Sequence, residues 1–118
     1  MKRIWNLAGV FLCLGLYGGP AAAAYVTGND LARFCQSDKS ADVLSCVNYV
    51  AGVIDYHLMM QSLGTEPVVD FCLPARLSEE EAAVVVARYL KRSPQDDSFI
   101  AASAVLMALQ KAYPCARR

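Results

Sequence analysis

The 118-residue sequence predicts a small all-α domain, a four-helix bundle stapled by two disulfides. Three observations lead to this fold class. Residues 40–63 place apolar side chains at the spacing of an α-helix, and shorter segments with the same periodicity lie on either side. Helix start and stop signals separate these segments. Four cysteines remain once an N-terminal leader is set aside, and an even count in a small exported chain is typical of disulfides.

Residues 1–24 have the pattern of a cleaved secretory signal peptide. Two basic residues follow the initial methionine, and residues 4–17 are apolar but shorter than the roughly 20 residues that span a bilayer. Ala22 and Ala24 supply the small side chains that a signal peptidase requires. An uncleaved anchor is the alternative interpretation. Cleavage would leave residues 25–118 as one exported helical domain with no membrane segment.

The mature chain would carry nine Lys and Arg against eleven Asp and Glu, a net charge of −2. Nucleic acids and anionic membrane surfaces bind proteins that present basic patches. The charge balance therefore supports neither partner. A chain of this length has room for one domain with a modest core.

The central segment, Ser40 to Leu63, is expected to be the core helix. It is apolar over most of its circumference, with a narrow polar strip near Asp55, so we expect other helices to surround it. Ser40 is the expected N-cap, and Gly64 is an ordinary C-terminal signal. Two apolar strips run along it, one made of Val43, Cys46, Val47, Val50, Ile54, His57 and Leu58, the other of Tyr49, Val53, Tyr56 and Met60.

Three further helices are expected. Asn29 caps a short helix that reaches Cys35. Ser78 and Glu81 form a capping box at the start of the third, and Ser93-Pro94 ends the third and begins a fourth that runs to about Ala112. Their expected inner faces are, in order, Leu31, Phe34 and Cys35; Ala82, Val85, Val86 and Tyr89; and Phe99, Ala102, Leu106, Leu109 and Tyr113.

Residues 65–74 are too apolar for a loop that hangs free in water, so this segment is expected to lie over the core.

The expected topology favours one disulfide pairing. Short connections make successive helices antiparallel, which places Cys35 near Cys46 and Cys72 near Cys115. Four cysteines allow three pairings, and this one is preferred. Zinc binding is the alternative use of these thiols, but the chain has no C-x-x-C pair, and His57 is its single histidine.

No pairing of a nucleophile with a base, no phosphate-binding glycine loop and no metal motif is present in the sequence. The acidic run at residues 79–81 is interpreted as an ordinary helix start. His57 is interpreted as a packed histidine with one hydrogen bond, with pH sensing or partner contact as the alternative. We therefore expect a domain that is not an enzyme, holds no cofactor or metal, and acts by binding.

An ordered set of motifs spans nearly the whole mature chain. It comprises GNDL at 28–31 followed by Cys35, CVNYVAGV at 46–53, FCLP at 71–74, YLKRSP at 89–94 and ALQKAYPC at 108–115. This set resembles the Rap/Tai family, periplasmic immunity proteins of bacterial type VI secretion systems. The resemblance implies an HdeA-like helical fold.

The resemblance also implies a mechanism. Family members bind peptidoglycan amidase effectors and block the substrate cleft, often as dimers. The expected partner is therefore an amidase effector protein in the periplasm, and a homodimer is possible. The family's blocking segment is not among the matched motifs, so candidate contacts are chosen for position only: Lys91, Arg92, Gln95 and Asp96 at the junction of the third and fourth helices, and Met59 and Gln61 at the end of the central helix.

Two alternative functions stay open at this stage. An acid-responsive periplasmic chaperone would share the HdeA-like fold, although two disulfides oppose a large opening. A structural envelope protein would share only the cysteine framework. Tight one-to-one binding to an amidase at neutral pH would favour immunity, and protection of a denatured client at pH near 2–3 would favour the chaperone.

Overall fold

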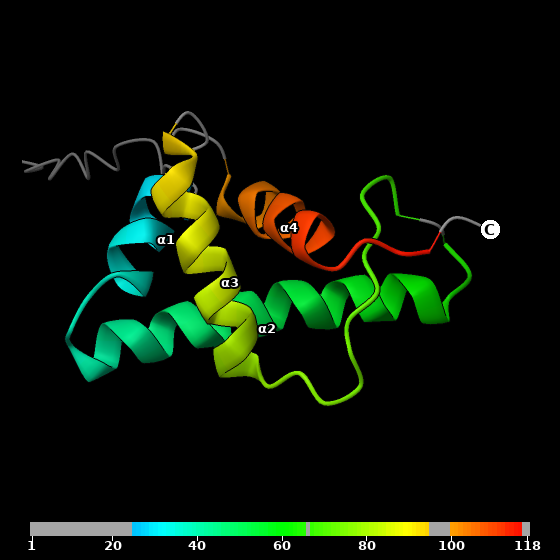
Figure 1. The fold of residues 1–118 in the computed structure, drawn as a ribbon, viewed down its shortest axis with the longest axis horizontal. Coiled ribbons are helices and arrows are strands. Elements are labelled where there is room, and N and C mark those ends of the chain that lie inside the picture. Colours follow the sequence, from blue (N-terminus) through cyan, green and yellow to red (C-terminus); the bar gives the residue numbers. More distant parts are fainter. Residues whose placement is uncertain (1–24, 66, 95–99, 117–118) are drawn as a thin grey trace, which may run out of the picture.

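The structure is a computed structural model that describes residues 25–65, 67–94 and 100–116. Four helices form this part of the chain: α1 (Gly28–Cys35), α2 (Ser40–Ser62), α3 (Glu79–Arg92) and α4 (Ala101–Ala112) (Figure 1). No strand is present in those ranges beyond an isolated bridge between Thr27 and Ile100. The predicted all-α class is therefore confirmed. The predicted leader at 1–24 lies outside the described residues.

Capping chemistry explains where two of the helices begin. In α3 the Ser78 hydroxyl accepts from the Glu81 N–H at 3.1 Å, and the Glu81 carboxylate accepts from the Ser78 N–H at 2.8 Å, which confirms the predicted capping box. In α1 the prediction of Asn29 as the cap is wrong. Thr27 is the cap instead, because Asp30 returns its hydrogen bond and completes a second capping box.

The start of α2 also differs from its prediction. Ser40 is the first helical residue, and Lys39, which precedes it, makes no side-chain cap. Ser37 organises this turn instead, since its hydroxyl accepts from the Lys39 N–H at 3.2 Å and donates to the Asp42 carboxylate at 2.7 Å.

The core lies where all four helices approach one another. Its largest fully buried side chains are Leu31, Val50, Phe71, Val86, Val105 and Leu109. Alanines fill much of the rest, at positions 82, 83, 101, 104 and 108. Small side chains let α3 and α4 approach closely, but each buries little apolar surface.

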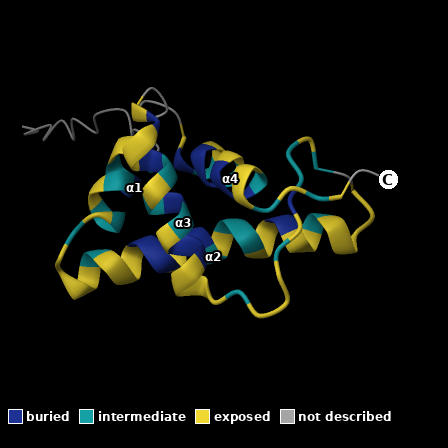
Figure 2. Cartoon of the chain, viewed as in Figure 1, coloured by how far each residue is buried: buried dark blue, intermediate teal, exposed yellow. Residues whose placement is uncertain are grey.

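The expectation that other helices surround α2 is wrong. Figure 2 shows exposed turns at both ends of α2 and buried positions in its middle. Val43 is 41% exposed, Tyr56 59% and Leu58 49%, although all three were expected on apolar strips. The reason is geometric. The 23 residues of α2 make it longer than the helices that pack on it, so its ends extend past the core.

By length and composition alone, α2 could cross a membrane. Its middle instead supplies Cys46, Val47, Val50 and His57 to the protein core.

The predicted inner faces of the third and fourth helices are confirmed in part, at Ala82, Val86 and Leu109, and the remaining buried positions lie on the neighbouring face. In α3 the buried residues are Ala82, Ala83, Val86 and Leu90, while Val85 and Tyr89 are half-buried. In α4 they are Ala101, Ala104, Val105, Ala108 and Leu109. The helix begins at Ala101 rather than at Ser93-Pro94, and Phe99 lies outside the described residues. A rotation of each helix about its axis by one residue position accounts for the difference between the predicted and the buried faces of α3 and α4.

The segment that joins α2 to α3 lies over the core, as predicted. Phe71 inserts its ring and is 2% exposed, and Leu73 is half-buried. Val68, at the turn of this loop, is fully exposed.

Two disulfides join the ends of these elements. Cys35 at the end of α1 is bonded to Cys46 in α2, and Cys72 in the connecting loop is bonded to Cys115 beyond α4. This is the pairing that the topology favoured.

The two crosslinks should differ in their contribution to stability. The Cys72–Cys115 bond closes 43 residues and the Cys35–Cys46 bond closes 11. In the chain-entropy model these loops contribute about 4 and about 3 kcal/mol. Urea denaturation of the two double Cys→Ala variants should therefore show the larger loss for Cys72/Cys115. Equal losses would contradict the entropic account.

Asp30 should contribute a pH-dependent share of the stability. Hydrogen bonds from the Thr27 side chain and backbone, and then from Arg33, hold the pKa of Asp30 below its ordinary value. Because the folded-state pKa is the lower one, this stabilisation is present above the unfolded pKa of about 4 and is lost as the pH falls through the folded value. The stability gap between the native chain and Asp30→Asn should close as the pH is lowered from 6 to 2. Asp38→Asn is the control, and a gap that widens on acidification would contradict the sign.

Candidate functional site

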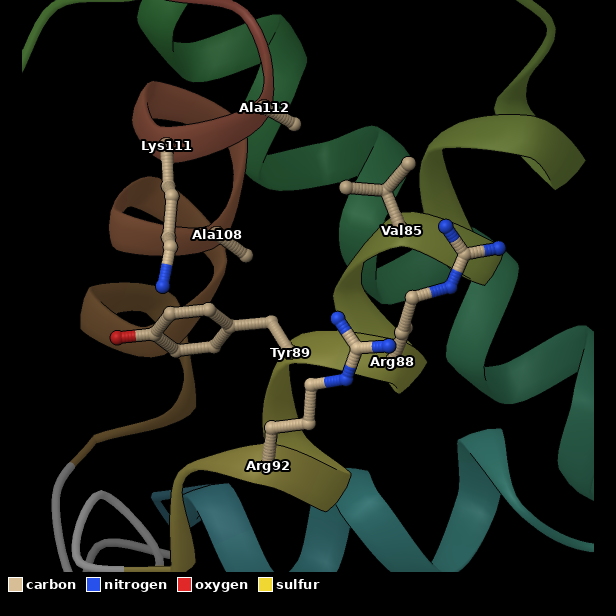
Figure 3. Close-up of a pocket in the computed structure, with 7 residues that line it drawn as sticks. All are labelled: Val85, Arg88, Tyr89, Arg92, Ala108, Lys111 and Ala112. Carbon is tan, nitrogen blue, oxygen red and sulfur yellow. The ribbon is translucent and has the colours of Figure 1, made fainter.

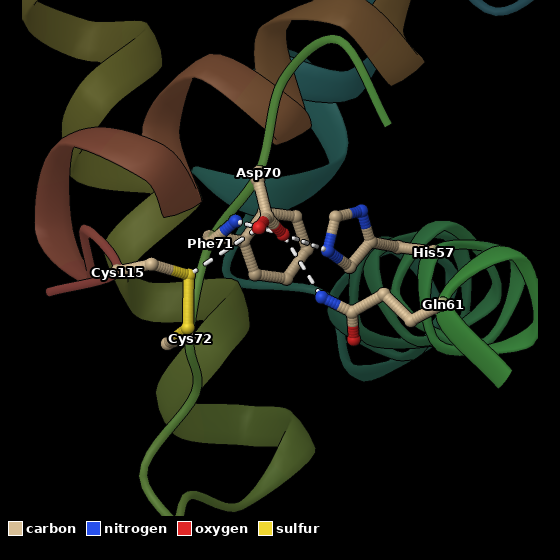
Figure 4. The surroundings of a disulfide bond; sticks show 6 residues. All are labelled: His57, Gln61, Asp70, Phe71, Cys72 and Cys115. Atoms are coloured by element: carbon tan, nitrogen blue, oxygen red, sulfur yellow. Dashed lines mark hydrogen bonds and ion pairs between the residues drawn. A yellow bond between two sulfur atoms is a disulfide. The ribbon is translucent and has the colours of Figure 1, made fainter. Parts of the chain in front are cut away.

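A single carboxylate organises the exposed end of α2. Asp70 Oδ1 accepts hydrogen bonds from Gln61 Nε2 at 2.9 Å and from the Phe71 backbone N–H at 2.9 Å, and it lies 3.1 Å from His57 Nε2 (Figure 4). An ionised carboxylate can only accept, so His57 Nε2 carries the proton. One side chain thus joins two turns of α2 to the connecting loop.

His57 is buried as well as hydrogen-bonded. Its side chain is 2% exposed and stacks on the Phe71 ring, with 3.8 Å between centroids and 15° between planes. This agrees with the interpretation of His57 as a packed histidine. A polar imidazole in the core needs a partner, and Asp70 supplies it.

The Cys72–Cys115 disulfide lies beside this carboxylate. Cys115 Sγ is 3.6 Å from Asp70 Oδ2, a contact rather than a hydrogen bond, since a disulfide sulfur has no proton to donate. The Cys72 N–H donates to the Tyr113 carbonyl at 2.9 Å. The loop is therefore anchored to α2 through Asp70 and to the end of α4 through Cys72.

The far end of α2 presents apolar surface to solvent. Met59 is 46% exposed and Leu63 70%. An apolar groove of about 400 Å³ continues along α2 toward α4, lined by Asn48, Tyr49, Gly52, Val53, Tyr56, Ala102 and Leu106. Burial raises the pKa of Tyr49 in this groove, and a backbone hydrogen bond with Ala102 acts in the opposite direction.

A second groove, of about 210 Å³, separates α3 from α4 (Figure 3). Arg88 and Arg92 reach it from α3, and Lys111 extends from α4 toward the Tyr89 ring. Its apolar lining comes from Val85, Ala108 and Ala112. The sequence reasoning proposed Arg92 but missed Arg88 and Lys111. Only the four-residue spacing of Arg88 and Arg92 on one helix could have been noticed in advance.

The predicted contact residues do not form one surface. Lys91 and Arg92 are exposed in the last turn of α3, and Gln95 and Asp96 lie outside the described residues. Met59 and Gln61 lie near the far end of α2, and Figure 1 shows that this end is well separated from the end of α3. Gln61 is already engaged by Asp70, which leaves Met59 as the more available of the two.

The thiols and the imidazole in the described ranges are already committed to other bonds. Cys35, Cys46, Cys72 and Cys115 are all oxidised, and His57 is bound to Asp70. No cluster of three potential metal ligands occurs in the part of the chain that the structure describes. What these surfaces offer is contact, through exposed apolar side chains and a basic groove.

Comparison with protein-family models shows which family the chain belongs to. The family model described as Rap1a immunity proteins matches residues 27–115, which include all four helices and all four disulfide-bonded cysteines. The chain belongs to the Rap1a immunity protein family. No curated protein and no solved structure matches it.

Membership of the Rap1a family indicates what kind of function to expect of the exposed surfaces. An immunity protein acts by binding a partner effector protein, and the family is generally non-enzymatic. The sites to consider are therefore protein-binding surfaces, held in place by the two disulfides and by Asp70.

Removing the Asp70 carboxylate should test how far this anchor matters. Asp70→Ala would leave the buried His57 N–H without its acceptor, which costs about 1–3 kcal/mol. Asp70→Asn keeps an acceptor oxygen at the same place and should lose less. Urea denaturation of both variants provides the measurement. Equal stability of the two would show that His57 does not depend on this hydrogen bond.

Proposed function

We propose that this chain is a periplasmic immunity protein that binds a peptidoglycan amidase effector of a type VI secretion system and blocks its substrate cleft. The observation that carries the proposal is the family match over residues 27–115, which spans the whole helical domain. The amidase as target comes from the resemblance of the sequence motifs to the Rap/Tai family.

Two features support action outside the cytoplasm. The first 24 residues have the pattern of a secretory signal peptide. The four mature cysteines form two disulfides, which persist in oxidising compartments such as the bacterial periplasm.

Blocking a cleft requires shape and rigidity rather than chemistry. A surface already held in its bound conformation loses less entropy on association, and so binds more tightly for the same contacts. The disulfide at Cys72 and the hydrogen bonds of Asp70 supply that rigidity next to the exposed end of α2.

Two regions are the proposed contacts. The junction of α3 and α4 offers Lys91 and Arg92, with Gln95 and Asp96 in the following segment, and α2 offers Met59 and Gln61. A homodimer, which the resemblance also implies, would present each region twice.

The acid-chaperone alternative makes a different demand on the fold. Such a protein releases apolar surface at low pH. Here Cys35–Cys46 holds α1 on α2, and Cys72–Cys115 holds the connecting loop on the end of α4. Both bonds persist in acid, so they limit the opening that this alternative needs.

Export of the neighbouring amidase provides the test. We expect that directing the amidase-like protein encoded beside this chain to the periplasm of a test bacterium lyses the cells, and that co-export of this chain prevents lysis. The purified pair should bind one-to-one at pH 7 by calorimetry. A catalytically inactive variant of the amidase is the control for toxicity.

Failure to bind or to protect would refute the amidase proposal. If the chain instead protected a denatured client at pH near 2–3 and not at pH 7, the acid-chaperone hypothesis would replace the amidase proposal.

A further inference from the structure

The groove between α3 and α4 carries a concentration of positive charge. Arg88, Arg92 and Lys111 line it, and none of the lining residues that the structure describes is acidic. None of the three cations has an ion pair or hydrogen bond within the described ranges, where Arg33–Asp30 and His57–Asp70 are the pairs present. Arg88 also lines the neighbouring groove at the start of α3, together with Glu80 and Glu81, and a further groove there is lined by Asp55 and Glu79. In a mature chain with net negative charge, this concentration of cations is local.

Helix geometry makes the arrangement unfavourable in the free protein. Arg88 and Arg92 are four residues apart on one helix, which brings their charges together, and like charges at that spacing destabilise a helix. Lys111 adds a third charge from α4 (Figure 3). The helix dipole favours cations in the last turns, which accounts for Arg92 and Lys111 individually. It does not account for Arg88, which lies a turn earlier, or for the convergence of all three.

The volume of the groove and its apolar lining residues limit what can bind there. Its volume of about 210 Å³ corresponds to roughly seven water molecules, room for one or two side chains. Val85, Ala108 and the Tyr89 ring form an apolar lining beneath the cations. Guanidinium groups bind carboxylates through two parallel hydrogen bonds, a geometry that Lys lacks.

From these observations we infer that the groove binds an acidic segment of the partner protein, with carboxylates against Arg88 and Arg92 and an adjoining apolar side chain against Val85 and Ala108. This inference rests on the proposed function, since the partner is the effector. It selects Arg92 from the predicted contacts, adds Arg88 and Lys111, and assigns no role to Lys91, which does not line the groove.

Charge reversal tests the groove in the complex. Arg88→Glu/Arg92→Glu should weaken binding of the full mature chain to the amidase at least about tenfold, because two attractive contacts become repulsive. The control Lys39→Glu/Arg76→Glu makes the same change in net charge at two exposed residues elsewhere, and should stay within about threefold of the native chain. Thermal denaturation should show that both variants are folded. Equal affinity of native chain and groove variant would overturn the inference while leaving the proposed function in place.

A binding probe that does not require the effector distinguishes failure of the groove inference from failure of the proposed function. The synthetic peptide Glu-Leu-Glu-Leu-Glu, titrated into chain labelled at arginine side-chain nitrogens, should shift the Arg88 and Arg92 NMR signals, and the basic peptide Lys-Leu-Lys-Leu-Lys should not. This outcome would support the groove as an acidic-peptide site even if the amidase did not bind. Absence of a shift would overturn it, and so would displacement of the peptide by millimolar inorganic phosphate, which would indicate a small-anion site.

Discussion

The Cys72–Cys115 disulfide is the constraint on which the rest of this structure depends. The loop that joins α2 to α3 has no secondary structure of its own, yet it supplies Phe71, one of the largest buried side chains. A core rich in alanine buries little apolar area per residue, so a domain of this size gains much of its stability from covalent links. Bonding Cys72 to the end of the chain keeps Phe71 in place, and Phe71 in turn forms the surface on which His57 stacks.

The exposed half of α2 follows from that arrangement. A helix of 23 residues extends past a core made by three shorter ones, so its outer turns would gain nothing from packing. The Asp70 carboxylate fastens them instead, by accepting from Gln61 and His57 and from the loop backbone. Apolar side chains such as Met59 and Leu63 can then remain in water on a helix that is nevertheless held in one position, and exposed apolar surface of this kind marks interaction sites.

Local chemistry made part of this structure predictable. The Ser78–Glu81 capping box depends on the spacing of two residues, and the preferred disulfide pairing on the antiparallel order of successive helices; both are present. Asn29 was the wrong choice of N-cap, because the side chains of Thr27 and Asp30 accept hydrogen bonds from each other's backbone N–H groups. Both residues are visible in the sequence, so this competing capping box could have been considered. The burial of α2 could not be predicted, since it depends on which turns the other helices cover. The basic groove could not be predicted either, because the packing of α4 on α3 decides that Lys111 lines the same groove as Arg88 and Arg92.

In an immunity protein built in this way, the groups that stabilise the fold are separate from the exposed basic groove. Its crosslinks and its buried imidazole hold the frame, and none of these groups lies at the basic groove between α3 and α4. Among the residues that the structure describes, the cations there have no ion-pair partner, so neither of the two ion pairs present in those ranges has to break before a carboxylate binds. Exposed side chains of this kind contribute little to folding and can be exchanged at small cost to the fold. The charges of this surface can therefore change while the disulfide frame remains the same.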